Sequence, residues 1–283
     1  MQQYKNIKAK EIIIGNNCRI ADDVSIEVNG VFQIGDCSII KSGTTIQCEE
    51  FKAGEYLYMS KQVEVGRGGF NNKEAIVHIG NHVGIFENVL INPNSPVTIG
   101  NDVGIGTEVM IWTHGAWLDI TQGFPADFGP VTIGDNVWIP ARTIMLPNTS
   151  IGSNSVIGIG STITKPIPSN AMAAGTPCKV IKENQYPKML SDKELENLIN
   201  PIIDYWKNIL APQKGIEDVN LYYDVPSKKI ELHQKHSVTI YDIITKQMTG
   251  DFTSESEDLR DFLRRRGIKI YTGKPFTSMK KIN

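Results

Sequence analysis

The stretch of the chain most suggestive of chemistry is "IWTHGAW" at residues 111–117, where a histidine follows an interrupted apolar pattern. Ile111 continues a series of regularly spaced isoleucines, and Trp112 breaks it. Histidine changes its charge near neutral pH, so His114 could take a proton from an attacking hydroxyl or amine and return it later. Two interpretations are open here: His114 is a general base, or it is a polar residue at the start of a surface loop.

The other histidines offer little chemistry. His78 and His82, and likewise His233 and His236, have spacings that could serve a metal ion. Neither pair is accompanied by clustered cysteines or carboxylates, which a protein metal site needs to complete its ligand set. We therefore expect no metal.

Composition excludes several classes of function. The 283 residues carry a formal net charge of −2, which gives no field for binding nucleic acid or a membrane surface. The chain shows no basic, apolar N-terminal signal and no apolar run long enough to span a bilayer. Its 4 cysteines lack C-x-x-C spacing and are too few for a disulfide scaffold. We expect a soluble protein of the reducing cytoplasm.

The elements that must position His114 are set by an internal repeat, in which an aliphatic residue returns every six positions, often followed by glycine. The repeat is clearest in pairs of units that begin at Ile14, Ile34, Ile79, Ile99, Ile133 and Ile151. A period of six fits neither an isolated strand nor a helix, but it fits a short strand plus a turn. Three units would complete one triangular coil.

Stacked coils would pair as parallel strands, with the isoleucines forming one ladder inside. The separation from Ile133 to Ile151 is one coil of 18 residues, and glycine and Asn-Asp pairs stand where the chain must bend. The alternative is an ordinary β-sandwich, which gives no reason for isoleucine-glycine to return in this register. We predict an all-β parallel β-helix with a small C-terminal α/β domain.

The repeat also predicts the organisation of the chain. Residues 1–186 form the β-helix domain, with an irregular interruption at 51–75 and a loop excursion at 112–130 that contains several aromatic residues and that we expect to be packed. Residues 187–283 form the small α/β appendage, which would bind the acceptor or support oligomerisation.

Local patterns predict the elements of the appendage. A capping box of Ser191 and Glu194 opens an amphipathic helix, which Pro201 should kink. Two alternating segments at 218–225 and 229–233 form a hairpin, and a strand near 237–244 follows it. A helix at 254–266 and a last strand at 268–271 complete the prediction.

The sequence resembles the hexapeptide-repeat acyltransferases, and residues 79–184 resemble the branch of galactoside, maltose and polysaccharide O-acetyltransferases. The resemblance is carried by "VTIGDNVWIPARTIMLPNTSIGSNSVIGIGSTITKPIPSNAMAAGTPCKVI". It implies that the β-helix is left-handed, an exception to the usual right-handed crossover. It also implies a homotrimer with active sites between subunits, and a C-terminal tail that holds acetyl-CoA as acyl donor.

The resemblance favours the general-base interpretation of His114, because the family's catalytic histidine opens the loop that leaves one coil. Glu87, Asn88 and Asn94 lie one coil earlier and are candidates to orient the imidazole or to contact the acceptor. The alternative for each of them is a polar residue at a coil corner. Trp112 and Trp117, which flank His114, would wall an acceptor cleft.

Other residues match positions that contact the donor in the family. These are Trp138, Ala141, Gly158, Gly160, Thr164, Lys165, Lys179 and Lys182. The lysines suit the phosphates of coenzyme A, and an amide of the 158–162 turn could donate to the thioester oxygen. Pro140 departs from the family's glycine and removes a backbone donor.

The sequence therefore predicts an acetyl-CoA-dependent acetyltransferase that acts directly on a sugar hydroxyl, without a covalent acyl-enzyme. An N-acyltransferase acting on a nucleotide-linked amino sugar is the nearest alternative. A non-catalytic β-helix scaffold is the alternative from another class. We expect no nucleic-acid partner and no membrane span.

Overall fold

A computed structural model describes residues 6–66 and 72–281. The chain divides into two compact units, Met1–Lys188 and Met189–Asn283. Each unit has its own apolar core.

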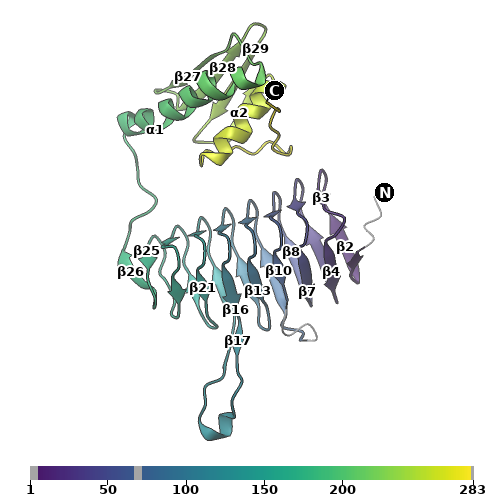
Figure 1. Ribbon diagram of the computed structural model, residues 1–283. Coiled ribbons are helices and arrows are strands. Elements are labelled where there is room, and N and C mark those ends of the chain that lie inside the picture. Colours follow the sequence, from purple (N-terminus) through teal and green to yellow (C-terminus); the bar gives the residue numbers. More distant parts are fainter. Residues whose placement is uncertain (1–5, 67–71, 282–283) are drawn as a thin grey trace. The chain divides into compact units, whose positions relative to one another are not determined.

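The first unit is a parallel β-helix in which the chain visits three sheets in turn (Figure 1). Sheet 1 contains β2 (Glu11–Ile14), β5 (Val31–Ile34), β8 (Glu50–Ala53), β11 (Ile76–Ile79), β14 (Val97–Ile99), β19 (Val131–Ile133) and β22 (Ser150–Ile151). Sheet 2 contains β3 (Arg19–Ile20), β6 (Ile39–Ile40), β9 (Tyr58–Met59), β12 (Gly84–Ile85), β15 (Gly104–Ile105), β20 (Trp138–Ile139), β23 (Val156–Ile157), β25 (Met172–Ala174) and the antiparallel β26 (Lys179–Lys182). Sheet 3 contains β1 (Ile7–Lys8), β4 (Ser25–Val28), β7 (Thr45–Cys48), β10 (Glu64–Val65), β13 (Leu90–Asn92), β16 (Met110–Trp112), β21 (Ile144–Met145) and β24 (Thr162–Ile163). We call the three turns between sheets corner 1–2, corner 2–3 and corner 3–1.

The predicted isoleucine ladder lies in sheet 1. Ile14 pairs with Ile34, Ile79 with Ile99, and Ile133 with Ile151, each in parallel register. Burying one isoleucine side chain contributes roughly 1.5–3 kcal/mol, so the ladder fixes the register of every coil it passes through.

The predicted interruption at 51–75 is wrong for the residues that the structure describes there. Ala53 takes the place of an isoleucine and pairs with Ile34 on one side and Ile79 on the other. Alanine suffices at this rung because Phe51 stacks on Phe32, with ring centroids 5.7 Å apart, and fills the interior. The coil then continues through β9 and β10; residues 67–71 lie outside the described part of the chain.

The corners are built from residues that tolerate a left-handed backbone. Asn88, Asn136 and Asn154 all have φ between 55° and 58°, a region that asparagine enters more readily than most residues. At corner 1–2 the side chains also tie the coils together. The backbone N–H of Asn101, for example, donates to the Asp135 carboxylate at 2.6 Å.

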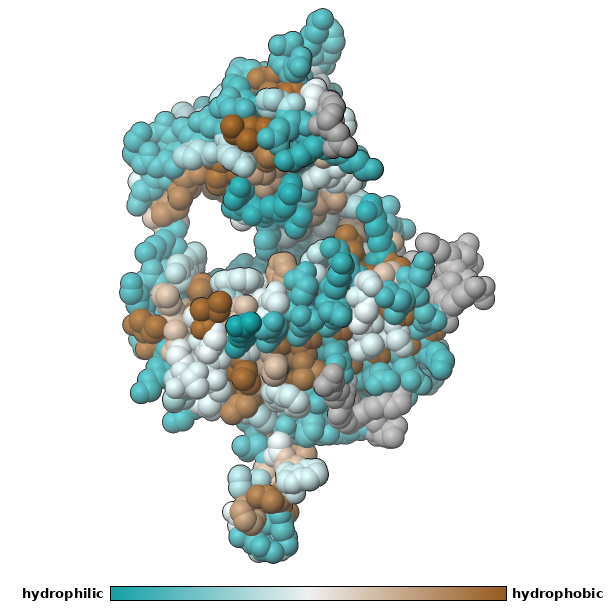
Figure 2. Space-filling model, viewed as in Figure 1, coloured by the Kyte–Doolittle hydropathy of each residue, from teal (hydrophilic) through white to brown (hydrophobic). Residues whose placement is uncertain are grey.

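One insertion leaves the coil at corner 3–1, between Trp112 and Val131. It is a narrow arm made of β17 (His114–Gly115), the short 3-10 helix η1 (Ile120–Gln122) and β18 (Asp127–Phe128), which pairs antiparallel with β17. The expectation of a packed loop is wrong within one chain, because the arm projects from the coils and its apolar side chains are exposed (Figures 1 and 2). Trp117 is 94% exposed.

The second unit packs its helices on one face of a four-stranded antiparallel sheet. Its elements are α1 (Asp192–Tyr205), the π-helical turn η2 (Trp206–Leu210), the 3-10 turn η3 (Pro212–Lys214), β27 (Asn220–Asp224), β28 (Lys229–Gln234), β29 (Ser237–Asp242), β30 (Gln247–Gly250) and α2 (Ser254–Arg265). The predicted capping box of α1 is present, and the helix continues through Pro201. The predicted hairpin is present as β27 and β28.

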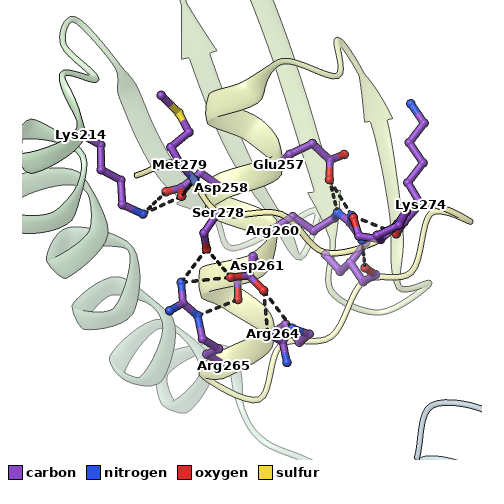
Figure 3. Close-up of polar contacts among 12 residues, drawn as sticks. Lys214, Glu257, Asp258, Arg260, Asp261, Arg264, Arg265, Lys274, Ser278 and Met279 are labelled. Carbon is purple, nitrogen blue, oxygen red and sulfur yellow. Dashed lines mark hydrogen bonds and ion pairs between the residues drawn. The ribbon is translucent and has the colours of Figure 1, made fainter. Parts of the chain in front are cut away.

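The predicted last strand at 268–271 is wrong, since β30 supplies the fourth strand and the C-terminal tail is irregular. Polar side chains of α2 hold that tail instead (Figure 3). The Arg260 guanidinium is fully buried and donates to the carbonyls of Ile270 and Pro275. Buried Asp258 accepts from Lys214 and from the backbone N–H of Met279. Buried polar groups that are fully paired can fix a segment that has no regular structure of its own.

Candidate active site

His114 lies at the root of the arm, where the chain leaves corner 3–1. Its imidazole stacks on the ring of Phe128, with centroids 6.1 Å apart and planes inclined by 18°. The ring of Trp112 meets it edge-on at 6.5 Å. Two aromatic neighbours therefore restrict the rotation of the imidazole.

Hydrogen bonds fasten the arm's root to the coils on either side. The buried Thr113 hydroxyl donates to the carbonyl of Asn92 at 2.7 Å, one coil earlier. The Thr113 carbonyl accepts from the Gly129 N–H, which closes the root of the hairpin. The side-chain amide of Asn148, one coil later, donates to the Phe128 carbonyl at 3.1 Å.

A Cβ atom at residue 129 would lie 1.7 Å from Oδ1 of Asn148, so any larger residue there would force the Asn148 side chain to move. The return strand of the arm thus runs directly against the next coil, and this close approach helps to set the position of Phe128 beneath the imidazole.

Two buried polar atoms at this corner have no hydrogen-bond partner among the described residues. They are Nδ1 of His114 and Oδ1 of Asn92, a side chain that is only 1% exposed. Leaving a buried donor or acceptor unpaired is unfavourable by about 1–3 kcal/mol. Unpaired polar atoms cluster at functional sites, where a ligand or another chain can supply the missing partner.

The structure separates the three candidate partners of His114. Asn94 lies at the same corner 3–1, where its carbonyl accepts from the side chain of Asn72 at 2.7 Å. Glu87 and Asn88 lie at corner 2–3, at the other end of sheet 3. Within one chain, therefore, Glu87 and Asn88 do not reach the imidazole.

Glu87 belongs to a polar cluster of its own at corner 2–3. Its carboxylate accepts from the Ser60 hydroxyl at 2.5 Å and from the Thr107 hydroxyl at 3.3 Å. The hydrogen bond from Ser60 is the main reason that the pKa of Glu87 is lowered, and the positive charge of Lys41 acts in the same direction. Glu87 is therefore held as an anion on the surface of the coil.

The residues expected to contact the donor form three groups. Ala141, Gly158 and Gly160 lie along corner 2–3, above Glu87 and Asn88 in the coil order, and Trp138 lies on sheet 2 beside that corner. Thr164 and Lys165 lie at corner 3–1, in the same column as His114, while Lys179 and Lys182 lie on β26 and are exposed.

Trp138 lies flat against the backbone of the neighbouring coil. Gly104 is its register partner, and a Cβ atom at Gly104 would lie 2.6 Å from the indole. The edge of the indole meets Phe86 at 6.5 Å between centroids. The ring remains 43% exposed, which leaves one face available to a ligand or another chain.

Of the two tryptophans expected to wall an acceptor cleft, only Trp112 contacts His114. Trp112 is part-buried and continues β16, whereas Trp117 stands on the exposed part of the arm. The single chain brings no other described side chain against Trp117 that would complete such a cleft.

In each of the two histidine pairs, one imidazole lies within hydrogen-bond distance of a carboxylate. Nε2 of His78 lies 2.6 Å from Oε1 of Glu50, and His233 lies 2.8 Å from Glu231. Across residues 6–66 and 72–281, no group of three or more His, Cys, Asp or Glu side chains has the arrangement of a metal site. In the same ranges, no helix has the length and apolar character that a membrane crossing requires.

Sequence reasoning missed Phe128, Asn92 and Asn148, which position the arm and the imidazole. Phe128 and Gly129 follow "PAD" in the excursion, and an aromatic-glycine pair just before the repeat resumes is a usable signal for the return strand. Asn92 stands where the preceding isoleucine ends its strand, so the six-residue pattern alone assigns it to a turn.

The fold and the site define a class: a β-helix of hexapeptide repeats with a histidine-bearing arm. Residues 130–165 match the family model described as bacterial transferase hexapeptide (six repeats). The galactoside O-acetyltransferase of Escherichia coli (strain K12) is 40% identical over 128 residues, which cover 45% of this chain and 57% of the relative. A putative acetyltransferase of Saccharomyces cerevisiae is 42% identical over 131 residues, covering 45% and 59%.

Among solved structures, a galactoside acetyltransferase in complex with coenzyme A is 33% identical, with coverage of 52% of this chain and 70% of that one and a TM-score of 0.41. On the sequence matches, this chain belongs to the hexapeptide-repeat transferases, and galactoside O-acetyltransferases are among the proteins it is similar to. The chain spans less than two thirds of the length of the first curated relatives it matches.

Proposed function

We propose that this protein transfers an acetyl group from acetyl-CoA to a hydroxyl group of a sugar, with His114 as general base. The observation that carries the proposal is the position of His114 at the root of an arm, held between Phe128 and Trp112, in a β-helix of the hexapeptide-repeat transferases. The names of the relatives favour a saccharide acceptor and O-acetylation.

The proposed reaction needs one proton carrier and no covalent enzyme intermediate. The imidazole takes the proton of the acceptor hydroxyl while that oxygen attacks the thioester carbonyl. The new C–O bond forms, the C–S bond breaks, and the departing thiolate receives the proton back from the imidazolium. An amide of the 158–162 turn would donate to the thioester oxygen as negative charge develops there.

A complete site requires two copies of the chain, because its parts occupy two corners. His114 and Asn94 lie at corner 3–1, whereas Glu87, Asn88, Ala141 and Gly158 lie at corner 2–3. The seven residues from Thr107 to Thr113 separate these corners by roughly 20 Å when extended. We propose a ring of three subunits, in which corner 3–1 of each meets corner 2–3 of the next, a head-to-tail contact that closes.

The donor would lie in the part of that contact formed by the coils that follow the arm in the sequence. Trp138 and Ala141 line the first of these coils, and Gly160 has a left-handed φ of 69° with open space beside its Cα. Lys165, Lys179 and Lys182 would pair with the phosphates of coenzyme A. Pro140 lacks the amide that the family's glycine would offer at this place.

For residues 187–283 we propose a role in acceptor binding or in subunit contact. A variant that ends at residue 186 separates the two roles. Loss of acceptor affinity with an intact trimer supports acceptor binding, and loss of the trimer, measured by light scattering, supports subunit contact.

The proposed function is tested with a panel of sugars, amino sugars and nucleotide-linked amino sugars, acetyl-CoA and detection of the released thiol. We expect transfer to a sugar hydroxyl and a loss of about 10²–10⁴-fold in kcat for His114→Ala. Calorimetry with coenzyme A is the control, since His114→Ala should still bind it. Wild-type turnover by His114→Ala would overturn the mechanism, and absence of coenzyme A binding by the wild type would favour a scaffold.

A further inference from the structure

The outer face of sheet 2 carries a continuous aromatic strip beside corner 2–3, formed by Tyr58, Phe86 and Trp138. The centroids of Tyr58 and Phe86 are 6.0 Å apart, and those of Phe86 and Trp138 are 6.5 Å apart. The ammonium of Lys41 lies over the Tyr58 ring at 4.9 Å and closes the lower end of the strip.

Two glycines keep the strip flat and open. Gly84 and Gly104 are register partners between Tyr58 and Trp138, so the sheet carries no side chains in the row between them. Phe86 bends across Gly84 and Trp138 across Gly104. Phe86 remains 37% exposed, so three rings present their faces or edges along one line.

The level of His114 divides Tyr58 and Phe86 from the residues expected to hold the donor, which include Trp138. Ala141, Gly158, Gly160 and the lysines all belong to coils after the arm, whereas Tyr58 and Phe86 belong to coils before it. Trp138 leans across the boundary, over the coil from which the arm leaves. If the donor binds along the coils after the arm, the surface of the coils before the arm remains available to the acceptor.

Polar groups accompany the rings in the way a sugar requires. The Glu87 carboxylate follows Phe86 directly and lies beside the Ser60 and Thr107 hydroxyls. Sugar rings present C–H groups on their faces, which pack on aromatic rings, and hydroxyls on their rims, which bind carboxylates and alcohols. An apolar protein surface packed over the rings would instead leave the Lys41 charge at the end of the strip desolvated.

We propose that the part of the aromatic strip formed by Tyr58 and Phe86 is an extended acceptor subsite, which binds a saccharide chain and not a single sugar. The inference rests on the proposed function, because it places the acceptor relative to His114. From the level of Gly104 to that of Tyr58 is two coils, or about 10 Å. This length exceeds one pyranose ring and fits a chain of two or more, and Lys41 favours a carboxylate at the far end.

The test measures saccharide binding separately from chemistry. Full-length His114→Ala protein with coenzyme A present is titrated by calorimetry with glucose, maltose, maltotriose and trigalacturonate. We expect maltotriose to bind about tenfold more tightly than glucose, and trigalacturonate more tightly still. Tyr58→Ala and Phe86→Ala should abolish the gain with length, and Lys41→Met should abolish only the preference for the acidic chain.

Met110→Ala is the matched control, since Met110 is 39% exposed on the neighbouring sheet 3 and belongs to neither site. Binding that does not depend on chain length or on the two rings would overturn this inference while leaving the proposed acetyl transfer untouched. Conversely, length-dependent binding with no acetyl transfer by the wild type would contradict the proposed function alone. A change of oligomeric mass in Tyr58→Ala or Phe86→Ala would show that the strip is a subunit contact and overturn the inference.

Discussion

The imidazole of His114 lies nearly parallel to the phenyl ring of Phe128, with 6.1 Å between their centroids. The two residues are register partners on the two strands of the arm. The orientation of the proposed base therefore depends on the closure of the hairpin that carries it, and not on the β-helix alone.

Removing the ring should loosen the base without removing it. We expect Phe128→Ala to lower kcat by about tenfold, less than His114→Ala, because the imidazole remains but loses its fixed orientation. Steady-state kinetics measures the effect, and Phe128→Tyr, which keeps the ring, should restore most of the rate. An unchanged kcat in Phe128→Ala would contradict the positioning role.

The close approach of Gly129 to Asn148 gives a paired test. Gly129→Ala places a methyl group on Oδ1 of Asn148 and should open the arm's root, at a cost of about 1–3 kcal/mol. Limited proteolysis of the arm reports the opening as faster cleavage. The double variant Gly129→Ala/Asn148→Ala removes the obstruction, and equal cleavage rates in the single and double variants would show that the two residues are not coupled.

Trp112 and Trp117, which flank His114 in the sequence, should affect the acceptor more than the donor. We expect Trp112→Ala and Trp117→Ala to raise the KM for the sugar by about tenfold and to leave the KM for acetyl-CoA nearly unchanged. Because Trp117 is exposed in the single chain, its effect should require the assembled oligomer. Equal changes in both KM values would count against an acceptor cleft.

Asp261 should make the second unit sensitive to acid. Burial alone would raise its pKa, but hydrogen bonds from Ser278 and Arg264 lower it below the ordinary value of 3.8. The folded state therefore binds the proton more weakly than the unfolded state, and the stabilisation is present above pH 3.8 and lost as the pH falls through the folded pKa. Hydrogen exchange in α2 should rise below that pH.

Asp261→Asn is the control for this acid effect, because its side chain does not titrate. The variant should be less stable at neutral pH, since the charged bonds to Arg264 and Arg265 are lost. Its exchange should then change little between pH 5 and pH 3, a range set by the ordinary carboxyl pKa. A wild-type-like pH dependence in the variant would assign the effect to another group.

Much of the β-helix could be predicted because its signal is periodic. Ile79, Ile99 and Ile133 recur in register, and a buried ladder leaves few other residue types acceptable at those positions. The coil at 50–65 escaped this reasoning, because the space that Ala53 leaves is filled by Phe51 on the same strand. A search for isoleucine at each rung cannot detect a strand in which a small residue at the rung is compensated by a large side chain two positions away.

The candidate site was only partly predictable for a different reason. His114 could be identified from its residue type and its place at the end of a repeat. Phe128 could not, because it lies beside His114 only through the pairing of a hairpin that falls outside the repeat. Glu87 and Asn88 are near His114 in coil order, yet corner and sheet place them at the far end of sheet 3. The sequence separation of two residues predicts which coils they belong to. It does not predict which corner of the β-helix faces a neighbouring subunit.

The strands of sheet 1 before and after the arm pair directly with each other, so the arm does not interrupt the sheet. β14 pairs directly with β19, and Ile99 faces Ile133 although 34 positions separate them, compared with 20 between Ile79 and Ile99 and 18 between Ile133 and Ile151. The β-helix therefore does not depend on the arm for the pairing of its coils. Segments of other length or composition could replace residues 115–128 without repacking a single interior rung, so the chemistry presented at this corner can diversify while the body that carries it stays the same.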